Sequence, residues 1–511
     1  MTNISIGAKA GTGKTTIVCW SLQGVPKGMK PSDEQKAIIS AVKKVKAKTK
    51  RVTAFSKAIQ MELETRLPAS VEKCTNHSFG LRCIKQNIKG KMKIGDGYKN
   101  FNICEELSGK VSNAAPGAKR DLMTMYRDCS DAVSLMKLTL TGEMTSDGWY
   151  ATEDQIRETL SLYSQECNCS IGMVQEVLKI SSMRTNIIDF DDMVAMPVMH
   201  KMKRDQVDLA FVDESQDMNR AQQELCFGSA ENMVIVGDVN QSIFGFAGAD
   251  PEAIPRMESY LQENGGLTVL PLYTTRRCPK VVVAEAQAYV PEFKAHESNE
   301  EGVIARIDSA DSINQLLASY AQNIHTMVLC RTNAPLSRLV FALIRNNCPA
   351  YIRGKSIGVQ LIRTIKSFKA SSIMELMMKL EAYESLETQK LQLSSRPDRD
   401  DKMLALTDKC ACIRIFSDGV DSIDGIVDRI EKMFDDKLDN KSICLSSVHK
   451  SKGLEATRIF ILRPDLLPHP KISSKSAFNA QQERNLAYVA ITRSKRDLIY
   501  INPETKETDD A

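Results

Sequence analysis

The segment from Ala8 to Thr15, AKAGTGKT, has the composition of a loop that binds phosphate groups. Glycines at its fourth and sixth positions let backbone N–H groups turn toward phosphate oxygens. Lys14 can reach the β- and γ-phosphates of a nucleotide, and the Thr15 hydroxyl can bind Mg²⁺. A chance glycine-rich turn is the alternative, but the loop follows an apolar run and precedes a helical pattern. We therefore predict a nucleoside-triphosphate site whose ligands are Ala10, Gly11, Thr12, Gly13, Lys14, Thr15 and Thr16.

A pair of acids, Asp213 and Glu214, directly follows the apolar segment 209–212. An apolar strand that ends in acids is typical of a Walker-B site. Asp213 would hold Mg²⁺ directly or through water, and Glu214 would orient and deprotonate the attacking water. A solvated turn explains the acid pair equally well when it is taken alone. Its combination with a phosphate-binding loop favours the catalytic interpretation.

Short apolar runs of strand type recur along the chain and position these residues. Each run is followed by Gly, Asp, Ser or Arg and then by a helical pattern, which indicates an α/β fold of parallel sheets with crossover helices. Ligands of such sheets lie beyond the carboxyl ends of the strands, where the residues described above are expected. The predicted strands are Ile4–Ile6, Val207–Val212, Met233–Val236, Met327–Cys330 and Ile459–Leu462.

At about 150 residues per domain, the length of 511 residues allows three or four structural units. Two charged stretches of helical pattern, 86–184 and 355–440, predict helical insertions into two sheet domains, and the second insertion is short. The polar, acidic C-terminus predicts a loose tail. The predicted boundaries are a first domain at 1–85 and 185–265 with its insertion at 86–184, a second domain at 266–354 and 441–503 with its insertion at 355–440, and a tail at 504–511.

The bulk composition, with 42% hydrophobic and 26% charged residues, is ordinary for a globular protein. The net charge of +4 does not indicate a nucleic-acid-binding protein, so such binding would need a local basic surface. No apolar run approaches the ~20 residues that span a bilayer, and the early phosphate-binding loop argues against a signal peptide. The 14 cysteines are scattered, with Cys167/Cys169 and Cys410/Cys412 as the closest pairs, and predict reduced, mostly buried thiols in a cytosolic protein.

The order of these motifs and several others resembles the UvrD/Rep/PcrA-type helicases of superfamily 1. The phosphate loop is similar to the variant of that group, which also begins with Ala, and Asp213–Asp217, DESQD, resembles its DEAQD motif. Residues 236–249 resemble GDxxQSIYxFRGA, with Ala247 in place of the usual Arg. In the C-terminal third, residues 447–455 resemble THxSKGLE and residues 482–495 resemble YVAxTRAK.

Further segments extend the resemblance over nearly the whole chain. Residues 54–58 and 74–79 resemble the DNA-contact segments of the first motor domain, and Asp189–Asp192, DFDD, resembles another family segment. Residues 276–279 resemble the YRS or YRC segment. There Arg276 replaces the Tyr that stacks on adenine in the family, and its guanidinium plane could substitute for that ring.

The resemblance implies two RecA-like P-loop domains with helical insertions, which bind ATP and Mg²⁺. It implies that Gln241 senses the γ-phosphate and that Glu455 holds the ribose. It also implies that Arg277 and Arg493, from the second domain, reach the γ-phosphate as arginine fingers. The implied metal ligands are Thr15 and Asp213, and the implied catalytic residues are Lys14, Asp213, Glu214, Gln241, Arg277 and Arg493.

A single DNA strand is the implied track of this motor, bound by phosphate contacts and by stacking on aromatic rings. Phe55 and Phe246 are the favoured stacking residues, while Phe79 fits base stacking and core packing equally well. The remaining candidates would contact DNA phosphates or couple DNA binding to ATP hydrolysis. The predicted DNA-binding residues are Phe55, Thr75, His77, Phe246, Ser447 and His449.

The function implied is that of an ATP-dependent DNA helicase that moves 3′ to 5′ on single-stranded DNA and acts at single-strand/duplex junctions. Its setting would be replication, repair or recombination in the cytoplasm of a bacterial or phage-infected cell, with replication or repair proteins as partners and no membrane. A DNA-dependent ATPase that strips proteins or remodels DNA without unwinding is the main alternative, because the second insertion is short. A nucleotide-gated binding module without hydrolysis is a third interpretation, which the complete set of catalytic residue types disfavours.

The adenine-reading Gln of the family lies upstream of the phosphate loop, whereas a similar string, residues 31–36, follows the loop in this sequence. Ser32 and Gln35 have the spacing of a capping box. We therefore interpret this string as the start of a helix, with Ser32 as its N-cap and Gln35 at its third position.

Overall fold

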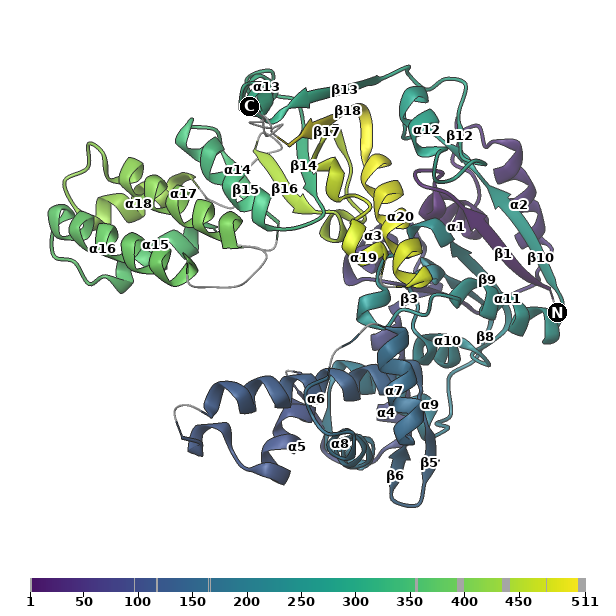
Figure 1. Cartoon of the computed structure of the whole chain (residues 1–511). Helices are drawn as coiled ribbons and strands as arrows, with labels where there is room; N and C mark the ends of the chain where they lie inside the picture. The colour runs from purple at the N-terminus through teal and green to yellow at the C-terminus, as the bar shows by residue number, and fades with distance from the viewer. Residues whose placement is uncertain are drawn as a thin grey trace. The chain divides into compact units, whose positions relative to one another are not determined.

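The chain contains two six-stranded sheets, each made of parallel strands. One lies in Met1–Thr274 and the other in Thr275–Ala511 (Figure 1). We refer to these parts as the N-terminal unit and the C-terminal unit. A computed structural model describes residues 2–95, 97–115, 118–163, 165, 167–353, 357–392, 399–433, 442–474 and 476–503. All five predicted strands are confirmed, and the fold is α/β as expected. Among the described residues, no helix combines the length and apolarity needed to cross a bilayer.

The sheet of the N-terminal unit has the strand order β10-β1-β9-β8-β2-β3. All of its neighbouring pairs are parallel, so the loops that leave β1, β9 and β8 emerge at one edge of the sheet. Ile4, Phe211 and Val234 are fully buried, as expected for a parallel sheet covered on both faces. The strands are β1 (Asn3–Ala8), β2 (Lys50–Ala54), β3 (Val71–Thr75), β8 (Val207–Val212), β9 (Ala230–Gly237) and β10 (Leu267–Leu272). The helices that connect these strands outside the inserted region are α1 (Lys14–Gln23), α2 (Asp33–Lys43), α3 (Lys57–Arg66), α10 (Arg220–Cys226) and α11 (Ala253–Glu263).

A largely helical region interrupts this sheet between β3 and β8 (Figure 1). Its hydrophobic core joins Phe79, Tyr126, Val133 and Val177 across three helices. A short antiparallel hairpin, β5–β6, lies between two of the helices. The elements are α4 (Asn76–Asn87), β4 (Lys93–Ile94), α5 (Lys99–Ser108), α6 (Lys119–Thr139), β5 (Glu143–Thr145), β6 (Gly148–Tyr150), α7 (Glu153–Leu162), α8 (Ile171–Met183), β7 (Ile187–Ile188) and α9 (Phe190–Met199).

Two buried lysines connect this region to the DFDD segment. Lys99 Nζ and Lys137 Nζ lie 2.6 and 2.7 Å from the two carboxylate oxygens of Asp192, and all three side chains are almost fully buried. Asp189 caps α9 by accepting a hydrogen bond from Asp192 N and also pairs with Lys137 at 3.3 Å. Removing one partner of a buried ion pair typically costs about 3–5 kcal/mol. The DFDD segment therefore fixes α5 and α6 against α9.

The sheet of the C-terminal unit has the order β13-β18-β17-β14-β16-β15, again with parallel neighbours throughout. Its strands are β13 (Val303–Asp308), β14 (Thr326–Cys330), β15 (Ala350–Ile352), β16 (Ile443–Ser447), β17 (Ala456–Leu462) and β18 (Ser494–Asn502). The elements around the sheet are β11 (Thr274–Thr275), α12 (Lys280–Ala286), β12 (Lys294–Ala295), α13 (Ser309–Ala321), α14 (Ala334–Arg345), α19 (Pro470–Ser473) and α20 (Ala477–Ile491).

A group of helices lies between β15 and β16 in the sequence and forms the green region of Figure 1. Cys410 and Ile413 belong to one hydrophobic core with Val340 and Leu343 of α14, so these helices continue the core of the sheet domain. The helices are α15 (Ile357–Ser367), α16 (Ile373–Gln392), α17 (Arg399–Ser417) and α18 (Ile423–Met433).

Candidate nucleotide and DNA sites

The glycine-rich loop joins the carboxyl end of β1 to the first turn of α1. Gly11 and Gly13 have φ angles of 65° and 89°, a left-handed conformation that glycine adopts without steric cost. The Thr12 hydroxyl donates to the Lys9 carbonyl at 2.9 Å, and Ile17 N donates to the Gly13 carbonyl at 2.8 Å. The loop thereby presents the start of α1, which carries a partial positive charge, at the carboxyl edge of the sheet.

Lys14, the first residue of α1, forms an ion pair across the loop. Its Nζ lies 2.7 Å from Glu214 Oε2, and the two side chains are only 11% and 19% exposed. Burial would lower the pKa of Lys14, but the neighbouring carboxylates, first that of Glu214, outweigh burial and raise it. The lysine is therefore held as a cation beside an acid of the DESQD segment.

Asp213 directly follows β8 and is 3% exposed. Burial, together with the charge of Glu214, raises the pKa of Asp213 to about 7. A bound divalent cation would favour the ionised form of this carboxyl. The Asp213 carboxylate and the Thr15 hydroxyl are oxygen donors of the kind that Mg²⁺ takes together with water and phosphate oxygens. The residues present therefore fit Mg²⁺.

The backbone and its neighbours fix Glu214 in place. Glu214 has a φ of 52°, which is uncommon for a residue other than glycine and is found preferentially at functional sites. Its N–H donates to Asp213 Oδ1 at 2.9 Å, and Gln216 Nε2 donates to Glu214 Oε2 at 2.6 Å. Gln216 Oε1 in turn accepts a hydrogen bond from Asp238 N at 3.0 Å. One glutamine thus links the segments that follow β8 and β9.

Gln241 lies in the segment that follows β9 and is 5% exposed. Its Nε2 donates to Asp238 Oδ2 at 2.6 Å, and burial raises the pKa of Asp238. A Cβ on Gly237 would lie 2.6 Å from Ser215 Oγ, so only glycine lets this segment approach the acids so closely. The structure therefore gathers the predicted catalytic residues of the N-terminal unit, Lys14, Asp213, Glu214 and Gln241, at the edge where β1, β8 and β9 end.

A second charged group lies in the C-terminal unit around Glu455. Arg277 Nε lies 2.5 Å from Glu455 Oε2, and Lys495 pairs with the other carboxylate oxygen. Burial would raise the pKa of Glu455, but the charges of Arg277, Lys495 and Arg493 lower it. Arg493 is 2% exposed and donates to the carbonyls of Val489 and Leu454, at 3.0 and 3.1 Å. The structure thus brings Arg277, Glu455 and Arg493 together.

The remaining candidates of the C-terminal unit follow β16. Ser447 ends this strand and is buried, and His449 begins the short 3₁₀ turn after it. Burial, and then the charge of Arg331, lowers the pKa of His449 to about 4. Arg331 forms a bidentate pair with Glu483 of α20, at 2.6 and 3.0 Å. A neutral His449 therefore lies near a buried ion pair that connects β14 to α20.

The aromatic candidates of the N-terminal unit differ in exposure. Phe55 stacks on Phe244 with ring centroids 5.9 Å apart and is half-buried. Phe79 is fully buried, and Arg51 Cζ lies 4.2 Å from its ring centroid, so the structure supports the core-packing alternative for Phe79. Phe246 lies in a 3₁₀ turn, and its side chain is outside the described residues.

Thr75 and His77 lie at the start of α4. The Thr75 hydroxyl accepts from Ser78 N at 3.1 Å and forms a capping box, so this side chain has a structural partner already. The His77 ring packs edge-on against Phe190, with centroids 6.1 Å apart, and burial lowers the pKa of His77. Phe190 is 58% exposed, which is unusual for an aromatic side chain.

Residues 1–262 of the chain match the UvrD/REP helicase N-terminal domain, and residues 418–505 match the UvrD-like helicase C-terminal domain. The chain belongs to the UvrD/Rep helicase family. The order of motifs along the chain and the two parallel-sheet units agree with this membership.

Curated relatives in several organisms are named as DNA helicases. F-box DNA helicase protein 1 of Schizosaccharomyces pombe is 25% identical over 482 residues, which is 89% of this chain and 52% of the relative. ATP-dependent DNA helicase PcrA of Bacillus subtilis is 21% identical over 447 residues, covering 63% of this chain and 60% of the relative. Rep of Escherichia coli is 35% identical over 78 residues, 13% of this chain and 12% of the relative. The chain thus spans about half the length of the first of these relatives.

Several residues near the UvrD/Rep motifs were not assigned a role from the sequence. Arg66 of α3 places its Nη2 3.3 Å from Thr16 Oγ1, and no sequence signal links two residues so far apart. Asp238 and Gln216 stand within quoted motifs, but only the fold shows that they hold Gln241 and Glu214. Phe190 stands in the DFDD segment, where its exposure could not be foreseen.

The string after the phosphate loop has the structural role expected for it. The Ser32 side chain accepts a hydrogen bond from Gln35 N, and the Gln35 side chain accepts one from Ser32 N. Both hydrogen bonds of the capping box at the start of α2 are therefore present. Gln35 is also buried against the loop, since its Nε2 would lie 3.8 Å from a Cβ on Gly13. The predicted helix start is therefore confirmed.

Proposed function

We propose that this protein is an ATP-dependent DNA helicase, which hydrolyses ATP with Mg²⁺ and moves 3′ to 5′ on single-stranded DNA. The observation that carries the proposal is the buried group of Lys14, Glu214 and Asp213 at the phosphate-binding loop. Phosphoryl transfer to water requires a cation for the phosphates, an acid that accepts a proton and a carboxyl that binds Mg²⁺. Lys14, Glu214 and Asp213 supply these three groups in that order.

The ion pair between Lys14 and Glu214 suggests how the nucleotide would change the site. Phosphate oxygens compete with the carboxylate for the lysine, so binding of a triphosphate draws Lys14 away from Glu214. Glu214 then becomes available to orient a water molecule and to accept its proton. Gln216 keeps this carboxylate in place through its 2.6 Å hydrogen bond. When bound, Mg²⁺ supplies positive charge to the phosphate oxygens.

Arg277 and Arg493 are proposed to stabilise the negative charge of the transition state. In the structure, Glu455 holds Arg277 by an ion pair of 2.5 Å. Arg493 donates to two carbonyls, which orient its guanidinium. A bound ribose would compete for Glu455, so the proposed role of Glu455 requires Arg277 to change partner. This exchange parallels the one proposed for Lys14.

Single-stranded DNA and its junctions with duplex are the proposed substrates, in replication, repair or recombination. Phe55, supported by Phe244, offers a ring on which a base can stack. The pair of His77 and Phe190 offers a second aromatic surface, of which Phe190 is more than half exposed. Stacking is tolerant of sequence, as a motor that moves along DNA requires.

The direct test is the ATPase rate with and without single-stranded DNA, followed by unwinding of duplexes that carry a 3′ or a 5′ tail. We expect single-stranded DNA to stimulate hydrolysis and the 3′-tailed duplex to be unwound. Stimulated hydrolysis with translocation but without strand displacement would instead support a translocase that strips proteins from DNA. Absence of hydrolysis under all these conditions would refute both.

A further inference from the structure

Four cysteine thiols that are distant in the sequence meet beside α6. Cys104 of α5 and Cys129 of α6 are fully buried, while Cys167 and Cys169, in the loop between α7 and α8, are partly exposed. The sulfur contacts run in series from Cys104 to Cys129, then to Cys169 and Cys167. The sequence predicted scattered thiols, because spacing along the chain does not show that these segments converge.

The sulfur atoms of Cys167 and Cys169 are in direct contact. Their sulfur atoms lie 3.0 Å apart, compared with about 2.05 Å in a disulfide, so a movement of roughly 1 Å would join them. The loop that carries them is fixed to α6, since Asp128 Oδ2 accepts from Asn168 Nδ2 at 2.6 Å and from Asn168 N at 3.3 Å. The two sulfur atoms are therefore held facing each other.

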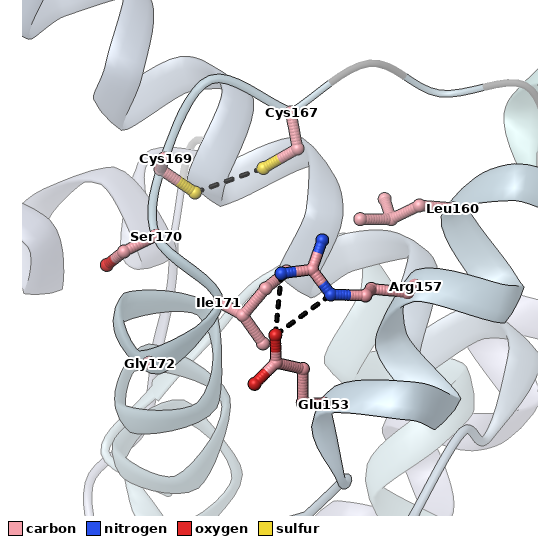
Figure 2. A pocket seen from close by; sticks show the side chains of 8 residues that line it. All are labelled: Glu153, Arg157, Leu160, Cys167, Cys169, Ser170, Ile171 and Gly172. Atoms are coloured by element: carbon pink, nitrogen blue, oxygen red, sulfur yellow. Dashed lines mark hydrogen bonds and ion pairs between the residues drawn. The ribbon is translucent and has the colours of Figure 1, made fainter.

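Small molecules can reach this pair. Cys167 and Cys169 line an open pocket of about 490 Å³, together with Leu160, Ile171 and Arg157. Figure 2 shows the two thiols facing each other at one side of the pocket and Arg157 at the other, bound to Glu153. The buried thiols behind the pair have no comparable access, since Cys104 and Cys129 are 0% exposed.

The chain contains a second Cys-X-Cys sequence that provides a matched comparison. Cys410 and Cys412 have the same spacing but lie within α17 and are fully buried. Residues two apart on a helix do not face each other. Cys412 instead donates to the Phe341 carbonyl at 3.5 Å. Equal spacing therefore gives facing thiols in one place and separated thiols in the other.

We propose that Cys167 and Cys169 form a modification site at which a peroxide converts the two thiols to an intramolecular disulfide. Cys169 is the attacking sulfur, and Cys167 is the resolving one. The Cys169 sulfur contacts two thiols, those of Cys129 and Cys167, and these hydrogen bonds lower the pKa of Cys169, while the contact with Cys169 raises the pKa of Cys167. Thiolate character and access are the two properties that select a cysteine for oxidation.

The reaction proceeds in two balanced steps. The Cys169 thiolate attacks one peroxide oxygen, the O–O bond breaks and hydroxide leaves, which gives a sulfenic acid on Cys169. The Cys167 sulfur then attacks the sulfenic sulfur, the S–S bond forms, the S–O bond breaks and water leaves with the Cys167 proton. In total, two thiols lose two electrons and two protons, and hydrogen peroxide is reduced to two molecules of water.

A thiolate cluster that holds a metal is the competing assignment. Among the described residues, no group of three or more His, Cys, Asp and Glu is placed to hold a metal ion. The contacts in series between the sulfur atoms agree with this finding. We therefore assign the Cys167/Cys169 pair to oxidation, and the experiment below includes the metal as an outcome.

The test treats the full-length reduced protein with hydrogen peroxide, alkylates the remaining thiols and analyses tryptic peptides by mass spectrometry. We expect the peptide that carries Cys167 and Cys169 to lose about 2 Da relative to its unalkylated reduced form. The peptide with Cys410 and Cys412 is the internal control and should remain alkylated at both positions. Equal oxidation of the two pairs would refute the proposal.

Two variants test which sulfur attacks. In Cys129→Ser/Cys167→Ser, neither thiol that contacts Cys169 remains, so a sulfenic acid on Cys169 should be trapped by dimedone. In Cys169→Ser, dimedone labelling of Cys167 should be at least about tenfold lower, as expected for a protonated thiol. Comparable labelling of both variants would overturn the assignment of the attacking sulfur. One equivalent of zinc in the purified wild-type protein, lost in Cys167→Ser, would overturn the modification site in favour of a metal site.

Discussion

The two charged groups of the molecule have opposite balances. Around the phosphate loop, three acids, Asp213, Glu214 and Asp238, act on the cation of Lys14, and Lys9 is a second cation near Asp238. Around Glu455 in the C-terminal unit, three cations, Arg277, Lys495 and Arg493, act on one acid. An excess of acids suits proton acceptance and Mg²⁺, whereas an excess of cations suits stabilisation of phosphate charge. The comparison agrees with the roles proposed above, which are proton acceptance for the acids of the N-terminal unit and stabilisation of phosphate charge for the cations of the C-terminal unit.

Removal of Lys14, the cation that pairs with Glu214, should have the largest effect on this contrast. We expect Lys14→Ala to abolish ATP hydrolysis, a loss of roughly 10³-fold or more, because the acids would then repel the triphosphate. Steady-state phosphate release with saturating single-stranded DNA measures the effect. Lys36→Ala, at an exposed lysine of α2, is the matched control and should keep wild-type turnover. Equal rates in the two variants would show that the acidic group does not act on the nucleotide.

Loss of one cation from the basic group should slow hydrolysis without abolishing it, because two other cations remain. We expect Arg277→Ala to lower kcat by about 10³-fold, the lower range for arginine fingers, with little change in ATP affinity. Single-turnover hydrolysis and nucleotide titration measure the two quantities separately. Arg306→Ala, at an exposed arginine of the same unit, controls for loss of charge. Unchanged turnover in Arg277→Ala would remove this residue from the catalytic group.

A comparison of Phe55 with Phe79 tests the proposed stacking of DNA bases. We expect Phe55→Ala to weaken binding of single-stranded DNA by roughly 5- to 150-fold, equivalent to ~1–3 kcal/mol for one stacked base. Phe79→Leu should leave DNA affinity unchanged and lower the melting temperature, because Phe79 is fully buried. Fluorescence anisotropy with labelled DNA and thermal unfolding separate the two outcomes. A reversed pattern would exchange the roles of the two rings.

The smallest expected effect is the pH dependence that arises from Asp213. Its pKa is raised from 3.8 to about 7 in the folded protein, so the folded state binds more protons than the unfolded state between these values. Stability from this group is present below pH 4 and is lost as the pH rises to about 7. We therefore expect Asp213→Asn to melt at a higher temperature than the nucleotide-free wild type at pH 8, and the difference to vanish near pH 4.

Thermal unfolding at several pH values between 4 and 8 measures this difference. Glu231→Gln, at an exposed position on β9, controls for the loss of one negative charge. A difference between Asp213→Asn and wild type that stays constant over this range would show that Asp213 is ionised throughout.

The fold could be predicted from the sequence where the signal is local. Each predicted strand is a short apolar run bounded by turn residues, and the capping box of Ser32 and Gln35 spans only four positions. The convergence of the sulfur atoms of Cys104, Cys129, Cys167 and Cys169 depends on the packing of distant helices, so no spacing rule reveals it. The same holds for Lys99 and Lys137, whose burial against Asp192 requires the assembled helices.

The sequence also predicted the main residues of the candidate site but not the partners that hold them. Motif order identified Lys14, Asp213, Glu214 and Gln241, which the parallel sheet then places at one edge. The partners that hold them, Gln216 and Asp238, depend on side-chain directions at the ends of β8 and β9. For Phe79, the sequence left base stacking and core packing open, because an aromatic residue in a contact motif fits either role until its burial is known.

The central claim is that Glu214 activates water at a site where Lys14 binds the phosphates. The most direct measurement compares Glu214→Gln with wild type in two assays, single-strand-stimulated ATP hydrolysis and equilibrium binding of ATP. Because Gln keeps the shape but not the basicity of Glu, we predict that hydrolysis is lost while nucleotide binding is largely retained. Hydrolysis at the wild-type rate in this variant would contradict the account.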